Sequence, residues 1–184
     1  MHAAQIDSTP EGLVPAGDGW YILNLGEMAW ETVPGFGVWR GFDDPDAEPS
    51  QRVAVHVHVL QPGEANGYYH AEAAQEGFLV LSGECLAVVE GEERRMRQWD
   101  YFHSPPGTEH ITVGAGDEPC AILMFGAPDP RRKVSWIADE TAAKHGASVA
   151  KTTSRGTEVY GEDLPPMSRV RPPKPFGNGG SSAR

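Results

Sequence analysis

The chain has 184 residues, the size of one globular domain with a substantial buried core. Its 26 acidic and 15 basic residues give a formal net charge of -11, and this excess of negative charge argues against a nucleic-acid partner. No apolar run approaches the length that spans a membrane, and the N-terminus lacks the basic start and apolar core of a signal peptide, so we expect a cytoplasmic protein.

Residues 1–50 contain two aromatic-rich segments, 20–25 and 36–42, that are typical of strands. We expect these N-terminal strands to pack on the central part of the chain, where they extend a sheet or cover its edge. An acidic loop is expected at residues 43–50. Aromatic strands at one end and a long tail at the other suit an isologous interface, so we also predict a homodimer.

Residues 51–128 are predicted to form an all-β core of short strands. Residues 76–81 and 85–89 are separated by Ser-Gly-Glu and predict a hairpin, and residues 94–98 form a charged edge strand. The predicted strands, bounded by Gly and Pro turns, are residues 52–60, 76–81, 85–89, 94–98 and 119–125. Many short strands at this spacing indicate a double-sheet jelly roll. Cys85 and Cys120 lie in separate apolar runs, and we expect buried free thiols.

Residues 129–163 are expected to hold one short helix and a connecting segment. The helix is predicted at residues 138–145, with acidic residues early, Lys144 and His145 late, and Gly146 as its end. Residues 164–184 contain five prolines followed by Gly-Asn-Gly-Gly-Ser-Ser. This composition cannot build a core, and it predicts an extended or disordered tail.

Two short motifs in the central region carry residues suited to bind a metal ion. His70, Glu72 and Glu76 share one parity, so in extended strands their side chains point to the same side. His110 begins an apolar run directly after a Pro-Pro-Gly turn, as expected of a strand that starts at the mouth of a barrel. Imidazole and carboxylate together suit divalent first-row metals, and two histidines with one carboxylate are a recurring open site for iron(II).

The spacing of these residues resembles the two signature motifs of the cupin superfamily. The first motif, a glycine before His-x-His, a glutamate and a second glycine, corresponds to Gly63, His70-x-Glu72, Glu76 and Gly83. The second, Gly-x5-Pro-x-Gly-x2-His, corresponds to Trp99, Pro105, Gly107 and His110. The resemblance covers residues 53–127 and is closest to small single-domain bacterial cupins. Trp99 in place of glycine, and Gly114 where asparagine is frequent, are departures that affect turns and packing.

A further departure falls at the metal itself, because Glu72 stands where the family usually has a second histidine. If His70, Glu72, Glu76 and His110 all ligate, the site is harder and more anionic than the usual one. It then favours iron or manganese, with zinc or nickel as alternatives. If Glu72 does not ligate, the other three residues form a face of two histidines and one carboxylate, and Glu72 is a general base beside the metal. The sequence leaves both interpretations open.

Four further side chains are candidates to line a substrate pocket. Phe78 and Val80 share the parity of Glu76 and should form an apolar wall. His56 and His58 lie on the face opposite the valines of residues 53–59. That face either lines the cavity or sits at a polar seam between subunits, and the seam is the simpler interpretation.

The resemblance implies two classes of function for a protein that binds a small molecule. The first is a metal-dependent enzyme, and we expect an oxygenase-like one that acts on a small acid, diketone or phenol, with Glu72 moving a proton. A cupin of the sugar isomerase or epimerase type is the alternative within this class. The second class is a non-catalytic ligand-binding cupin in which the metal is structural or absent.

Overall fold

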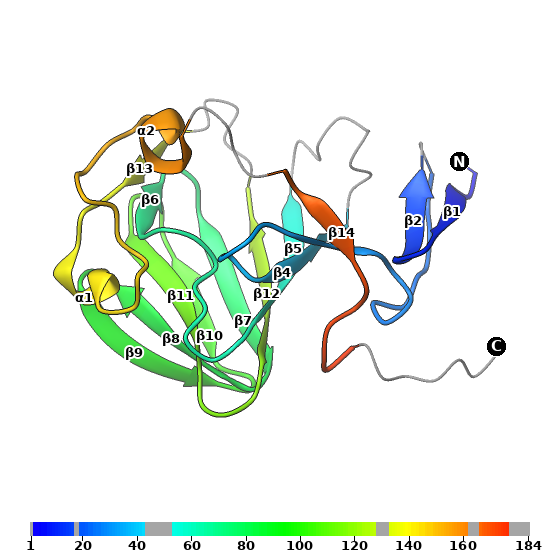
Figure 1. The fold of residues 1–184 in the computed structure, drawn as a ribbon, viewed down its shortest axis with the longest axis horizontal. Coiled ribbons are helices and arrows are strands. Elements are labelled where there is room, and N and C mark those ends of the chain that lie inside the picture. Colours follow the sequence, from blue (N-terminus) through cyan, green and yellow to red (C-terminus); the bar gives the residue numbers. More distant parts are fainter. Residues whose placement is uncertain (1, 17–18, 43–52, 128–132, 162–165, 177–184) are drawn as a thin grey trace.

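The computed structural model describes residues 2–16, 19–42, 53–127, 133–161 and 166–176, which form mainly two antiparallel sheets (Figure 1). The all-β jelly roll predicted from the sequence is confirmed. One sheet has seven strands in the order β10-β7-β12-β5-β4-β3-β14, and the other has five in the order β13-β6-β11-β8-β9. The larger sheet comprises β3 (Trp30–Thr32), β4 (Val38–Gly41), β5 (Ala54–Leu60), β7 (Glu76–Ser82), β10 (Tyr101–Ser104), β12 (Cys120–Gly126) and β14 (Ser168–Val170). The smaller comprises β6 (His70–Glu72), β8 (Glu84–Val89), β9 (Glu92–Arg97), β11 (Glu109–Ala115) and β13 (Val134–Trp136).

Several predicted strands are present close to their expected bounds. The alternating run at residues 52–60 gives β5, and the buried run at 119–125 gives β12, which lies between β7 and β5. The charged segment at 94–98 lies in β9, at the edge of the smaller sheet, as predicted. The predicted acidic loop at 43–50 lies outside the described residues.

The hairpin predicted between residues 76–81 and 85–89 is wrong. Strand β7 pairs with β10 and β12, whereas β8 pairs with β9 and β11, so the two consecutive strands belong to different sheets. Gly83, with φ of 72°, turns the chain from one sheet to the other, and a Cβ there would lie 2.5 Å from the Pro119 carbonyl oxygen. A hairpin and a corner between sheets have similar local turn chemistry, so the sequence alone does not separate them.

The space between the two sheets is filled by apolar side chains from both. This cluster includes Phe78 and Val80 of β7, Ile122 of β12, and both cysteines, which are buried as predicted. A second cluster lies on the other face of the larger sheet, around the fully buried Trp30. A third lies on the outer face of the smaller sheet, where it includes Tyr69 and Ile111. Each sheet is therefore covered on both faces over part of its area.

The N-terminal segment differs from its prediction in part. Residues 36–42 contain β4, as expected, but residues 20–25 contain only an isolated bridge between Trp20 and Ala3. Strands β1 (Gln5–Thr9) and β2 (Gly12–Ala16) form a separate two-stranded sheet at the far end of the molecule (Figure 1). The prediction treated aromatic content as the strand signal, whereas Trp20 is more than half exposed and has no sheet to cover.

The proline-rich segment after residue 164 makes contacts that its composition does not predict. Strand β14 pairs with β3, and Phe176 stacks on Trp30 with ring centroids 5.3 Å apart. Val170 and Phe176 thereby pack on the cluster around Trp30, so this part of the segment is extended but contributes to a core, which its composition did not predict. Residues 177–184 lie outside the described part of the chain.

Two short helices follow the jelly roll, where the sequence predicts one. Helix α1 (Glu140–Ala143) falls within the predicted segment, and the Asp139 side chain caps it by accepting a hydrogen bond from the Ala142 amide. Helix α2 (Gly156–Tyr160) was not predicted, because its five residues show no apolar periodicity. Neither described helix approaches the length or the apolar character needed to cross a membrane. The predicted homodimer stays a prediction.

Candidate metal centre

Three of the four predicted ligand residues converge between the sheets. His70 of β6 and His110 of β11 are direct cross-strand partners in the smaller sheet, with ring centroids 4.8 Å apart. Glu76 begins β7 of the larger sheet and reaches toward them from the opposite wall. One ligand atom from each of these residues lies within 4.8 Å of those of the other two. We call His70, Glu76 and His110 the ligand triad.

Both histidine rings are held by backbone carbonyl groups. The Nδ1 atom of His70 lies 2.7 Å from the Tyr68 oxygen, and that of His110 lies 3.0 Å from the Thr108 oxygen. A carbonyl oxygen can only accept, so in the neutral rings each Nδ1 carries the proton and donates it. The Nε2 atoms are then bare acceptors that face the centre of the triad, which is the tautomer that a metal ligand needs.

The acceptor atoms at the centre are buried and have no hydrogen-bond partner among the described residues. This holds for Nε2 of His110 and for Oε2 of Glu76, which lie 3.3 Å apart without hydrogen-bond geometry. Buried polar atoms are rarely left without a partner unless a water or an ion satisfies them. Two imidazoles and one carboxylate with adjacent orphaned acceptors therefore fit a divalent cation.

The electrostatics of the triad residues also favour a bound cation. Burial and the nearby charge of Glu72 raise the pKa of Glu76 to about 8. Burial and the neighbouring His70 lower the pKa of His110 to about 4, and burial lowers that of His70. Burial thus disfavours each group's charged form, which leaves both imidazoles neutral and able to ligate at physiological pH. A cation would favour the ionised form of Glu76.

Glu72, the fourth candidate, lies at the edge of the triad rather than within it. Its Oε1 atom is 3.9 Å from Nε2 of His70, and its side chain is 35% exposed, compared with 2% for His110. It is not among the residues whose ligand atoms cluster. Glu72 lines a small cavity together with Glu76, so it faces the space next to the triad. This placement fits a group that exchanges protons with a bound molecule better than it fits a ligand.

The predicted pocket residues all face the interior between the sheets. Phe78 is buried, with its ring 5.1 Å from that of His110, and Val80 is fully buried in the same cluster. His56 and His58 pair with Met124 and Ile122, which belong to the interior cluster. This face therefore turns toward the interior, as the cavity interpretation expects, and the valines on the other face are the ones covered by the segment around Trp30.

Two cavities share one lining residue, and the smaller of them borders the triad. The smaller, about 190 Å³, is lined by Glu72, Glu76 and His56 among others. The larger, about 340 Å³, is lined by His56, His58 and several aromatic residues. Because His56 lines both, it lies where they adjoin. Sequence reasoning missed Phe36, Trp39, Asn66 and Tyr160 of the larger cavity, since they lie outside the two motifs and carry no local signal of their own.

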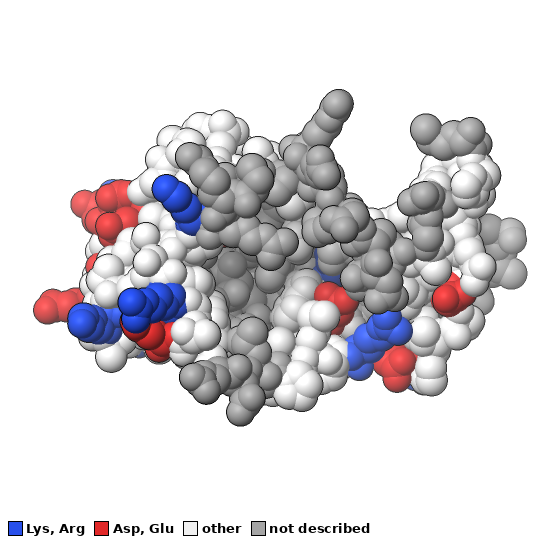
Figure 2. Space-filling view, turned by 90° about the horizontal axis from the view of Figure 1, so that it is seen from above, with Lys and Arg blue, Asp and Glu red and all other residues white. Residues whose placement is uncertain are grey.

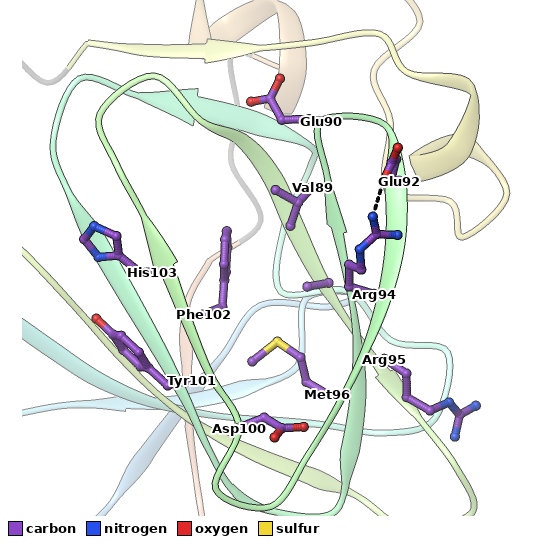
Figure 3. Close-up of a pocket in the computed structure, with 11 residues that line it drawn as sticks. Val89, Glu90, Glu92, Arg94, Arg95, Met96, Asp100, Tyr101, Phe102 and His103 are labelled. Carbon is purple, nitrogen blue, oxygen red and sulfur yellow. Dashed lines mark hydrogen bonds and ion pairs between the residues drawn. The ribbon is translucent and has the colours of Figure 1, made fainter.

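A further hollow lies away from the triad. It measures about 680 Å³ and lies between the edge strands β9 and β10 (Figure 3). Met96, Phe102 and Val89 point toward one another at its centre, while Arg94 pairs with Glu92 at the rim. None of the ligand triad lines it. This groove is larger than the two cavities lined by His56, but convergent polar groups and shifted pKa values are found at the triad, which is the better candidate site.

The charged side chains on one face of the molecule do not form a patch of one sign. On the face shown in Figure 2, acidic and basic residues of the described chain are interspersed, without a patch of one sign.

Comparison with known proteins places this site within a matched family region. Residues 56–126 match the family described as "Cupin domain". A cupin-like protein from Thermotoga maritima has a solved structure with a TM-score of 0.51 and 18% identity over 66% of this chain and 90% of that one. This match supports the fold.

Two other solved structures are similar over a smaller part. A sugar phosphate isomerase from a cupin superfamily of Silicibacter pomeroyi gives a TM-score of 0.42 and 24% identity over 46% of this chain and 54% of that one. The DMSP lyase DddQ of Ruegeria pomeroyi gives a TM-score of 0.44 and 23% identity over 52% of this chain and 49% of that one. The chain thus spans about half the length of these two proteins. No curated protein sequence matches the chain.

Proposed function

We propose that this chain, a member of the cupin superfamily, is a metal-dependent enzyme of the oxygenase type that acts on a small molecule. The observation that carries the proposal is the ligand triad: two histidines and one carboxylate with orphaned acceptor atoms at their centre. This donor set is the one that iron(II) oxygenases use, and it leaves coordination positions open. A divalent ion held there would supply Lewis-acid and redox chemistry.

The chain's own residues would bind and orient the substrate beside that ion. Phe78 and Val80 form an apolar wall next to His110, which excludes water from one side of the triad. The smaller cavity opens on the other side, so a substrate oxygen could approach between Glu72 and His56. A pocket with an apolar wall and few polar groups favours a small substrate held in one orientation.

Glu72 is the residue that we assign to proton transfer. It is half-buried, lies beside the triad, and shares the cavity with Glu76. A carboxylate in that position can accept a proton from a bound hydroxyl or return one to an oxygen, while the more enclosed Glu76 ligates. The two carboxylates would then have separate roles that follow from their different exposure.

The test is oxygen consumption by the full chain loaded with iron(II) under anaerobic conditions. Small acids, diketones and phenols are added one at a time, and uptake is followed after air is admitted. The proposal expects uptake that depends on one of these compounds and is absent in the His110→Ala variant. A chain that holds one iron ion and consumes no oxygen with any of them would count against an oxygenase and would leave the isomerase and binding alternatives.

A further inference from the structure

The cavity of about 340 Å³ has a lining unlike that of the triad. Ring side chains make up most of its lining, so we call it the aromatic cavity. His56 lies at its junction with the smaller cavity. The other lining residues that matter here are Val33, Phe36, Trp39, His58, Asn66 and Tyr160. Trp39 and His58 are cross-strand partners of β4 and β5, and their rings stack 6.0 Å apart at an angle of 20°. Its volume is near the lower end of the roughly 300–1,000 Å³ of ligand pockets.

Three aromatic residues from distant parts of the chain close one side of this cavity. Phe36 lies 5.3 Å from Tyr68 and 6.1 Å from Tyr160, and the two tyrosines lie 5.8 Å apart, measured between ring centroids. Tyr160 also contacts Trp136 edge to face. Residues before, within and after the jelly roll thus meet at this point, and their rings offer flat apolar surfaces rather than charges.

His58 offers the cavity a hydrogen-bond donor without a charge. Burial, with His56 as a smaller cause, lowers its pKa to about 3, so the ring is neutral at physiological pH. Its Nδ1 atom is shielded and has no partner. A buried bare acceptor costs less than a buried orphan N–H, so the proton resides on Nε2. Among the described residues no acceptor takes that proton.

Asn66 adds a second neutral donor. Its Oδ1 atom accepts hydrogen bonds from the amide and hydroxyl groups of Thr112, at 3.1 and 2.8 Å, which fixes the orientation of the carboxamide. The Nδ2 atom then has only the Met124 sulfur as a partner, at 3.7 Å. Sulfur is a weak acceptor and takes one of two hydrogens, so the other remains for a ligand oxygen.

The described charges near the cavity disfavour one class of ligand. Among the described residues that line the aromatic cavity and its smaller neighbour, none is a lysine or an arginine, and Glu72 and Glu76 are carboxyl groups. The buried Arg40 lies on the other face of the sheet, where it donates to the Ala29 carbonyl group. A phosphate ester needs cationic partners, so the described lining suits an uncharged ligand better than a sugar phosphate.

We propose that the aromatic cavity binds an uncharged aromatic ring that stacks near Trp39 and accepts hydrogen bonds from His58 and Asn66 through an oxygen substituent. A ring held there would extend past His56 toward Glu72 and the triad, since His56 lines both cavities. This names the substrate class of the proposed enzyme and in that respect rests on the proposed function. Binding of the ring itself does not require the metal.

The test is titration calorimetry at pH 7 on the full-length chain, both loaded with metal and stripped of it. The neutral aromatic probe is 4-hydroxyacetophenone, and glucose 6-phosphate represents the anionic ligands. We expect the ring to bind both forms and the phosphate to bind neither. His58→Phe should weaken ring binding by about fivefold, the size of one lost hydrogen bond. His58→Gln keeps a neutral donor and should restore most of it.

Matched substitutions separate binding from general damage to the fold. Trp39→Leu should also weaken ring binding by about fivefold, whereas Trp99→Leu, at an exposed tryptophan, and His103→Phe, at an exposed histidine, should leave it within about twofold. Thermal unfolding is recorded for each variant. Equal ring affinity in wild type, His58→Phe and Trp39→Leu would overturn the proposal, as would binding of glucose 6-phosphate in preference to the ring.

Metal content measured on the same samples distinguishes this inference from the proposed function. A chain that retains its metal but binds no ring refutes the aromatic cavity as a subsite and leaves the metalloenzyme intact. A chain that binds the ring with the expected response to His58→Phe, but retains no metal, supports the subsite and refutes the metalloenzyme.

Discussion

His70 and His110 are direct cross-strand partners, although they belong to separate motifs. Strands β6 and β11 are neighbours in the smaller sheet, and both histidine rings point to its inner face, 4.8 Å apart. Glu76 comes from the larger sheet, so the triad joins the two walls of the jelly roll. A metal ion at this point would cross-link the sheets, and the site depends on the fold rather than on local sequence.

The metal-free protein should lose stability as the pH rises because of Glu76. Its pKa is about 8 when folded and near 4.5 otherwise, so between these values the folded chain holds a proton that the unfolded chain has released. Stability from this group is therefore full below pH 4.5 and is lost as the pH rises through 8. Glu76→Gln has no proton to lose, and should be more stable than wild type at pH 9 by on the order of 2 kcal/mol.

The measurement is urea unfolding of both proteins at pH 5 and pH 9 with a chelator present. The stability advantage of Glu76→Gln over wild type should shrink toward pH 5, where the wild-type carboxyl group is protonated in the folded chain. Glu118→Gln, at an exposed position, is the matched control and should show no such dependence. The same stability difference at both pH values would show that Glu76 is not held in its neutral form by the fold.

Glu72→Gln should separate ligation from proton transfer. Because Glu72 lies outside the ligand cluster, the variant should retain the metal content of wild type. If Glu72 moves a proton in the reaction, the variant's turnover should fall by about 100-fold or more. Metal analysis and steady-state rates on one preparation check both parts. Loss of the metal in this variant would restore the interpretation with four ligands.

Replacing Trp99 with glycine, the residue usual at this place in the second motif, should stabilise the protein. Trp99 has φ of 73° and is 68% exposed, so it adopts a strained backbone conformation while burying little surface. Relief of about 1–2 kcal/mol of strain, offset by the flexibility of glycine when unfolded, predicts a net gain of about 0.5–1 kcal/mol for Trp99→Gly. Chemical denaturation measures it. Trp99→Ala removes the ring without freeing the backbone, and an equal gain there would contradict the explanation.

Short-range patterns in the sequence predict the strands of the jelly roll and identify the residues of the triad, whereas the meeting of those residues depends on the fold. Strand β5 is recognisable from its alternating polar and apolar residues, and β12 from its continuous apolar run between turns. The parity of His70 and Glu76 and the Pro-Pro-Gly turn before His110 indicate one shared site. The three residues do lie together in the fold, but His70 and Glu76 belong to strands of different sheets that face each other, so shared parity along one strand is not the cause.

Features that depend on long-range pairing were not predictable in the same way. The assignment of β7 and β8 to different sheets is set by β10 and β11, which pair with them from later in the chain. The inward orientation of His58 follows from its partner Ile122, and the aromatic cavity needs Phe36 and Tyr160 to meet. Glu72 shares the parity of His70, yet it lies at the end of β6 and is more exposed than His70. Parity predicts the side to which a side chain points but not how exposed it is.

The metal content of the purified chain tests the central claim most directly. After dialysis, elemental analysis should find about one iron or manganese ion per wild-type chain. His110→Ala should retain less than about a tenth of that while its circular dichroism spectrum stays unchanged, and the exposed His103→Ala should match wild type. Equal metal content in wild type and His110→Ala would contradict a site built from His70, Glu76 and His110.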